Sequence, residues 1–200
     1  TLQHTKGDCG MNILSFVFYT FLVTGTPGPT NLDILNTIKS QGRRAGIQYT
    51  YGASLAFFTL LVLSALINSL FAQYIPPVLT IMKVIGSLYM LYLVYLLFKS
   101  HDSDEPTNKG SFKSGYLLQF LNPKVITFTL TVLPSFVLGT YHTFTTISLF
   151  IIVITLIGVF SFGLWVVFGA LLQRFLQRHE MVVTIVMAIF LVYAAVVVWL

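Results

Sequence analysis

The stretch TGTPGPTNLD, residues 24–33, interrupts an apolar run that is long enough to cross a membrane. Its two prolines flank a glycine, and proline has no N–H to donate while its ring clashes with the carbonyl one turn earlier. The helix must therefore break here, and the carbonyls of Val23 and Gly25 lose their usual partners. Unpaired backbone groups at membrane depth are tolerated only where they are buried in protein or line a wet cavity. The break is thus a candidate binding site of the kind that transporters build from discontinuous helices.

The composition predicts an all-α membrane protein. The chain is 56% hydrophobic and 8% charged with a mean hydropathy of +0.86, whereas soluble domains carry about 25% charged residues. A single cysteine, Cys9, excludes an internal disulfide and a dithiol redox pair. The sequence has no phosphate-binding loop and no protease or esterase motif. We therefore expect no enzyme, no cofactor, no metal site and no nucleic-acid partner.

Six apolar segments follow one another, each near or above the roughly 20 residues that a spanning helix needs. They cover 13–38, 47–70, 77–98, 114–138, 144–172 and 181–200. The polar run 100–111 divides a single transporter domain, 11–200, into halves at 11–99 and 112–200. Residues 1–10 are polar and are interpreted as a remnant added for expression or as a short leader, with a signal peptide over 11–26 as the alternative.

Basic residues cluster in three of the connections between these segments. They are Lys39, Arg43, Arg44, Lys99, Lys109, Lys113, Arg174 and Arg178. The positive-inside rule places these connections, including the linker 100–111, in the cytoplasm and both termini outside. Because each half has three spans, the second half is inverted relative to the first, which predicts two inverted three-helix repeats.

The first span of the second half carries its own break, FLNPK, at residues 120–124. Asn122 suits the N-cap position and Pro123 the first position of a new helix. A half-helix is therefore expected to begin at each break, near mid-membrane, with unpaired N–H groups and a partial positive charge. In inverted halves the two positive ends converge, and such a pair is suited to a carboxylate.

Four motifs resemble the LysE/RhtB amino-acid exporters: PGPTN (27–31), GRRAG (42–46), GSLYMLYL (86–93) and LNPK (121–124). The stretch 172–193 is most similar to the cysteine/O-acetylserine exporter branch. The resemblance implies export of amino acids or close derivatives across the inner membrane of a prokaryote, coupled to the proton gradient.

Asp33 and Lys124 are the charges that lie deepest in the predicted spans. A charge at mid-membrane costs at least about 2.5–3.5 kcal/mol, so each needs a reason. Asp33 is interpreted as a site for a substrate ammonium or a proton, or else as the end of a capping box with Thr30. Lys124 is interpreted as a carboxylate contact or a charge partner for Asp33, or else as a lysine that snorkels to an interface.

These observations predict an exporter that binds a small zwitterion between spans 1 and 4. The carboxylate would meet Thr30, Asn31 and Lys124, and the ammonium would meet Asp33 and open carbonyls near Gly25. The predicted substrate-binding residues are Gly25, Pro27, Gly28, Pro29, Thr30, Asn31, Asp33, Tyr89, Gln119, Asn122, Pro123 and Lys124. Asp33 is also the predicted proton-coupling residue. The alternative is an uncoupled channel or facilitator for small polar solutes, and the chain could act alone or as a homodimer.

Small residues within the spans are expected to let helices approach closely. These are Gly52 and Ser54 in the second span, and Gly158, Ser161 and Gly163 in the fifth.

Overall fold

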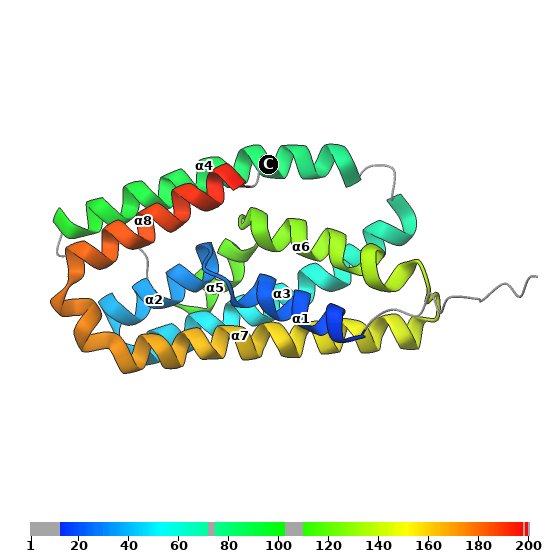
Figure 1. Cartoon of the computed structure of the whole chain (residues 1–200), viewed down its shortest axis with the longest axis horizontal. Helices are drawn as coiled ribbons and strands as arrows, with labels where there is room; N and C mark the ends of the chain where they lie inside the picture. Colours follow the sequence, from blue (N-terminus) through cyan, green and yellow to red (C-terminus); the bar gives the residue numbers. More distant parts are fainter. Residues whose placement is uncertain (1–12, 72–74, 103–109, 198, 200) are drawn as a thin grey trace, which may run out of the picture.

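The computed structural model describes residues 13–71, 75–102, 110–197 and 199, which form helices and their connections with no strand among them. The elements are α1 (Ile13–Gly25), α2 (Pro29–Gln41), α3 (Arg43–Phe71), α4 (Ile75–Asp102), α5 (Phe112–Gln119), α6 (Pro123–Leu133), the π-helical turn η2 (Pro134–Leu138), α7 (Phe144–Arg178) and α8 (Glu180–Val197) (Figure 1). The predicted all-α class is confirmed for this part of the chain. Residues 1–10, with Cys9, and most of the linker 100–111 lie outside the described residues.

Two continuous helices in the described residues are long and apolar enough to cross a membrane, Arg43–Asn68 in α3 and Phe144–Arg178. The pair Phe112–Gln119 and Pro123–Leu138, bent by 61°, is a third if it counts as one span. The helices α1 and α8 are shorter and apolar.

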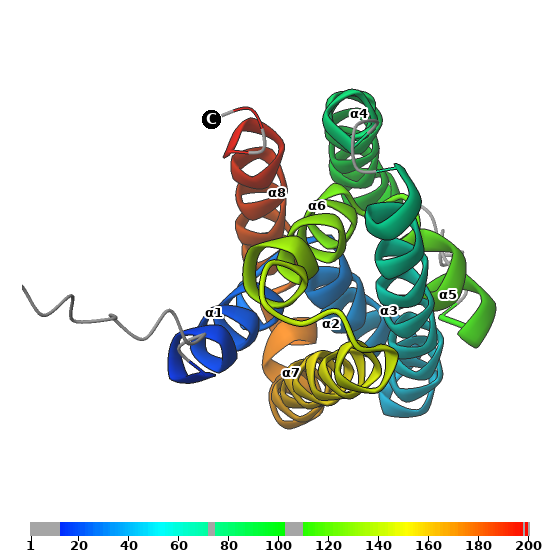
Figure 2. The same cartoon turned by 90° about the vertical axis from the view of Figure 1, so that its right-hand side faces the viewer.

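The helices run along the long axis of the molecule, with α2 and α6 near its centre (Figure 2). α7 packs against α1, α2 and α3, while α4 packs against α6 and α8. The ends of α2 and α4 and the junction of α7 with α8 lie at one end of the molecule (Figure 1). The described helix ends next to the basic residues Lys39, Lys99 and Arg178 are therefore gathered at this end.

Lys39 differs from its predicted place in a loop. It lies in the last turn of α2, where cations favour the helix dipole. Its side chain is only 6% exposed and forms a 2.8 Å ion pair with Glu180 at the start of α8. Its carbonyl accepts a hydrogen bond from Gln177 Nε2 at 3.0 Å. The C-terminal end of α2 is thus fixed to the α7–α8 junction.

The backbones of α3 and α5 touch. An added Cβ at Gly52 would lie 1.9 Å from the carbonyl oxygen of Phe112, and one at Gly115 would lie 2.0 Å from that of Tyr49. Gly158 is also confirmed as a close-packing residue, because its Cβ would lie 2.5 Å from the Phe57 ring. For Gly163 the expectation is wrong, since nothing described lies within 4 Å of its added Cβ.

We expect Gly52→Ala to destabilise the protein, because the new methyl group would overlap a backbone carbonyl that cannot turn aside. Overpacking of this kind costs typically about 1–3 kcal/mol. The matched control is Gly163→Ala, which should leave stability unchanged or raise it, since alanine favours helix over glycine by about 1 kcal/mol. Melting temperatures of the two variants in detergent check this. Equal melting temperatures would contradict backbone contact between α3 and α5.

Candidate functional site

The first break separates α1 from α2. Gly28 is the N-cap residue of α2, with an extended backbone, and Pro29 occupies the first helical position. A Cβ at Gly28 would lie 3.0 Å from Cδ and 3.2 Å from Nζ of Lys124. The absence of a side chain at Gly28 therefore lets the lysine of α6 lie against the beginning of α2.

The two carbonyls freed by the prolines both have partners. The carbonyl of Val23 accepts from Thr26 Oγ1 at 3.2 Å. The carbonyl of Gly25 accepts from Trp165 Nε1 of α7 at 3.0 Å. The expectation that carbonyls near Gly25 are open to a substrate ammonium is therefore wrong for this structure, because an indole N–H already occupies the Gly25 carbonyl.

The Asn31 side chain holds the break together from within α2. Its Nδ2 donates to the carbonyl of Thr24 at 3.0 Å and to that of Thr26 at 2.8 Å. Two acceptors fix which end of the amide carries the nitrogen. Asn31 is 3% exposed, and its Oδ1 has no hydrogen-bond partner among the described residues.

The second break brings the beginning of α6 against the beginning of α2. Asn122 is the N-cap residue of α6, and its Oδ1 accepts from the backbone N–H of Lys124 at 3.1 Å. Its Nδ2 donates to Thr30 Oγ1 at 2.7 Å. Thr30 Oγ1 in turn donates to Gln119 Oε1 at 2.5 Å. The prediction that the two breaks meet is confirmed.

Lys124 brings a positive charge to this junction. Its Nζ donates to the carbonyl of Thr26 at 2.8 Å and to Thr26 Oγ1 at 2.9 Å. In the described part of the chain the one ion pair joins Lys39 to Glu180. The expected charge pair of Asp33 with Lys124 is therefore not formed in this structure.

Asp33 lies one turn further along α2 and has different neighbours. Its Oδ2 accepts a 3.0 Å hydrogen bond from the Tyr49 hydroxyl of α3. The capping-box interpretation is wrong, because Gly28 is the N-cap residue and the Thr30 hydroxyl bonds to Gln119. Tyr89 of α4 is buried within electrostatic range of Asp33, and its hydroxyl has no partner among the described residues.

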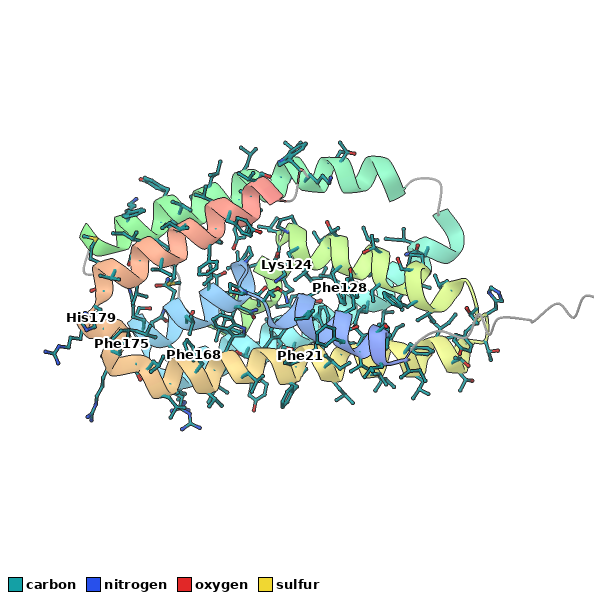
Figure 3. The ribbon with its side chains drawn as sticks, viewed as in Figure 1. Phe21, Lys124, Phe128, Phe168, Phe175 and His179 are labelled. Carbon is teal, nitrogen blue, oxygen red and sulfur yellow. The ribbon has the colours of Figure 1, made fainter. Side chains whose placement is uncertain are left out.

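Two cavities meet at Lys124. A cavity of about 470 Å³ lies between α1, α4, α6 and α8, and one of about 20 Å³ lies between α1, α2, α3, α6 and α7. Val23, Lys124 and Phe128 line both, and Lys124 and Phe128 are neighbours on α6 midway along the molecule (Figure 3). A small molecule at Lys124 could therefore reach both spaces.

Seven of the twelve predicted site residues line one or both of these cavities. Those that line the larger one are Pro27, Pro123 and Lys124. Those that line the smaller one are Gly28, Thr30, Asn31, Asn122 and Lys124. The others, Gly25, Pro29, Asp33, Tyr89 and Gln119, line neither of the two.

Sequence reasoning missed Trp165 and Tyr49. Trp165 lies in the middle of a 35-residue helix rather than at a membrane interface. A buried indole N–H usually needs a partner. A tryptophan in the middle of a span therefore indicated that a polar acceptor lies nearby. Tyr49 is 2% exposed, and its sequence neighbours give no sign that it faces Asp33.

The described residues contain no group of three or more His, Cys, Asp or Glu side chains that could hold a metal ion. The polar groups of the site are instead an ammonium, hydroxyls, amides and the beginnings of two helices. This set suits a small organic anion or zwitterion more than a metal.

Comparisons with known proteins identify the family of this chain. Residues 21–200 match the family model "LysE type translocator". The cysteine/O-acetylserine efflux protein of Salmonella paratyphi A is 31% identical over 188 residues, which cover 93% of this chain and 96% of the relative. The protein of the same description from Escherichia coli O1:K1 is 30% identical over 184 residues, or 91% and 94% of the two chains. No solved structure matches.

The resemblance predicted from the proline and Asn-Pro-Lys motifs is therefore confirmed over most of the chain. The matching relatives are transporters and not enzymes. This chain is a membrane transporter and belongs to the LysE type translocator family.

Proposed function

We propose that this protein is a secondary exporter of amino acids or close derivatives across the inner membrane of a bacterium. In this proposal α1–α2 and α5–α6 each form one broken span, and six spans make two inverted three-helix repeats. The basic connections face the cytoplasm and both termini lie outside. The family match and the cysteine/O-acetylserine efflux relatives support export of an amino acid.

The observation that carries the proposal is the position of Lys124. Its ammonium lies where two helices begin, beside a cavity, with only hydroxyl and carbonyl oxygens as partners among the described residues. The beginnings of helices carry partial positive charge and unpaired N–H groups. A substrate carboxylate at Lys124 would add charge-assisted hydrogen bonds, which are stronger than the neutral ones present.

The larger cavity suggests the kind of side chain that the substrate carries. Beside Lys124 its walls are apolar, aromatic or hydroxyl-bearing: Tyr19, Val23, Thr26, Pro27, Met90, Pro123, Thr127, Phe128, Thr131, Phe190, Tyr193 and Ala194. A second positive charge on the substrate would meet the lysine and no acid among these residues. We infer a preference for amino acids with uncharged side chains, and cysteine and O-acetylserine are of this kind.

Asp33 is the proposed proton-coupling residue. It is the acidic residue nearest the break, it is held by the Tyr49 hydroxyl, and it lies beside a small hollow lined by α4 and α8. We infer that Asp33 takes up and releases its proton here, away from the proposed carboxylate site at Lys124.

The test is accumulation of labelled L-cysteine by proteoliposomes under an imposed pH gradient. We expect the native protein to accumulate substrate and Asp33→Asn only to equilibrate it, because the asparagine amide can still accept from Tyr49 but does not take up or release a proton. Lys113→Gln, at an exposed position of α5, is the control and should accumulate normally.

Two results would contradict parts of the proposal. Full accumulation by Asp33→Asn would remove Asp33 from the coupling. Equilibration without accumulation by the native protein would favour the uncoupled channel or facilitator.

A further inference from the structure

The small cavity beside Lys124 contains one buried acceptor whose hydrogen-bonding capacity is not used. Asn31 lines this cavity, and because its Nδ2 is held by the carbonyls of Thr24 and Thr26, its Oδ1 is the atom of the amide that can still accept a hydrogen bond. Asn31 is 3% exposed, and this oxygen has no partner in the part of the chain that the structure describes. A buried amide oxygen without a donor is costly. This oxygen can therefore accept a hydrogen bond from a donor that the described residues do not provide.

The size of the cavity limits what that donor can be. Its volume is about 20 Å³, and a space of about 10–15 Å³ is enough to hold one water molecule. An amino group is close to water in size, whereas a carboxylate is larger and would place its oxygens against the amide oxygen. The space fits one nitrogen with its hydrogens.

Aromatic rings complete the walls. Phe57, Phe128 and Phe162 all line the cavity. The Phe57 ring stacks on that of Phe128 with centroids 6.0 Å apart and meets that of Phe162 edge to face, also at 6.0 Å. The faces of aromatic rings attract cations. Lys124 also lines this cavity, so the charge of a substrate ammonium here would be offset by the substrate's own carboxylate at Lys124 and by the rings, with no acid of the protein among the lining residues.

We propose that Asn31 Oδ1 and these three phenylalanines form the amino-group site of the transporter, and that Asp33 does not contact the substrate. The inference rests on the proposed function, because it needs an amino acid at Lys124. In an α-amino acid the amino group and the carboxylate are on the same carbon. The shared wall of Val23, Lys124 and Phe128 lets the carboxylate lie at Lys124 while the amino group enters the small cavity and the side chain extends into the large one.

The test compares L-cysteine with 3-mercaptopropionate, which is the same molecule without the amino group. Binding to the purified full-length protein is measured by calorimetry under reducing conditions. We expect the native protein to bind L-cysteine at least about tenfold more tightly, as the loss of a hydrogen bond to a charged donor implies. Asn31→Ala should reduce this ratio to about one. Asn68→Ala is the matched control and should keep the native ratio, since Asn68 Nδ2 also donates to two carbonyls, of Ser64 at 2.9 Å and Leu130 at 3.3 Å, away from both cavities.

Two further measurements keep the proposal open to refutation if Asn31→Ala does not fold. Phe57→Leu should lower the ratio severalfold, and Asp33→Asn should leave it unchanged. Equal binding of the two ligands by the native protein would overturn the amino-group site, as would a ratio that falls in Asp33→Asn but not in Phe57→Leu. Failure of the native protein to bind either ligand would instead count against the proposed function itself.

Discussion

Lys124→Gln is expected to abolish amino-acid export while the protein still folds and inserts. The lysine is a donor to Thr26 alone among the described residues, at 2.8 Å and 2.9 Å, and glutamine can keep one of these bonds through its amide nitrogen. The proposed carboxylate would lose its only cation. A hydrogen bond to a charged group contributes about 1.5–3 kcal/mol, so affinity should fall about 10- to 150-fold from this contact alone.

Efflux of labelled L-cysteine from proteoliposomes measures this effect, with melting temperature as the check on folding. Lys113→Gln removes the same charge from an exposed position of α5 and should export at the native rate. Because Asp33 is bonded to Tyr49 rather than to Lys124, loss of the lysine should leave no acid without its partner, and stability should change little. Native export by Lys124→Gln would contradict a carboxylate site at this residue.

The double change Pro27→Ala and Pro29→Ala is expected to stop transport by letting α1 and α2 join into one helix. The two new N–H groups can bond the carbonyls of Val23 and Gly25 in the regular α-helical way. Trp165 would then lose its acceptor, and Lys124 would lose the exposed carbonyl of Thr26. The gain and loss of hydrogen bonds nearly balance, so we expect a folded protein with transport reduced to background.

Pro134→Ala is the matched control, because Pro134 also interrupts regular helix, at the start of η2, but lies outside both cavities. It should transport like the native protein. Transport by the double variant at the rate of Pro134→Ala would show that the break is not needed for the site.

The positions of the breaks could be predicted because the effect of proline is local. It acts on its own N–H and on the carbonyl four residues earlier, so residues 27–29 and 122–123 determine where α1 and α5 stop without reference to the rest of the fold. The same locality made Asn122 recognisable as an N-cap. The ends of the other helices agree with the apolar segments to within a few residues, except that α7 continues to Arg178.

The partners of the break could not be predicted, because they come from distant helices. Nothing near Asp33 indicates that Tyr49 of α3 faces it, and its charge suggested Lys124 instead. Asp33 and Lys124 were expected to pair because each follows a helix break. Asp33, however, lies four residues beyond Pro29, a full turn from the junction, and is turned toward α3. Sequence spacing placed each residue on its helix, but it could not determine which neighbouring helix each face would contact.

The hydrogen bond from Trp165 to the Gly25 carbonyl also bears on how the protein is made. The two residues are 140 positions apart, and ribosomes add about 5–20 residues per second, so Gly25 is synthesised roughly 7–30 s before its donor. During this interval a bare carbonyl cannot remain in lipid at low cost. We therefore expect the nascent N-terminal half to stay in contact with water or with the insertion machinery until α7 is made. In this account the N-terminal half inserts stably into the bilayer only after the C-terminal half, with Trp165, has been made.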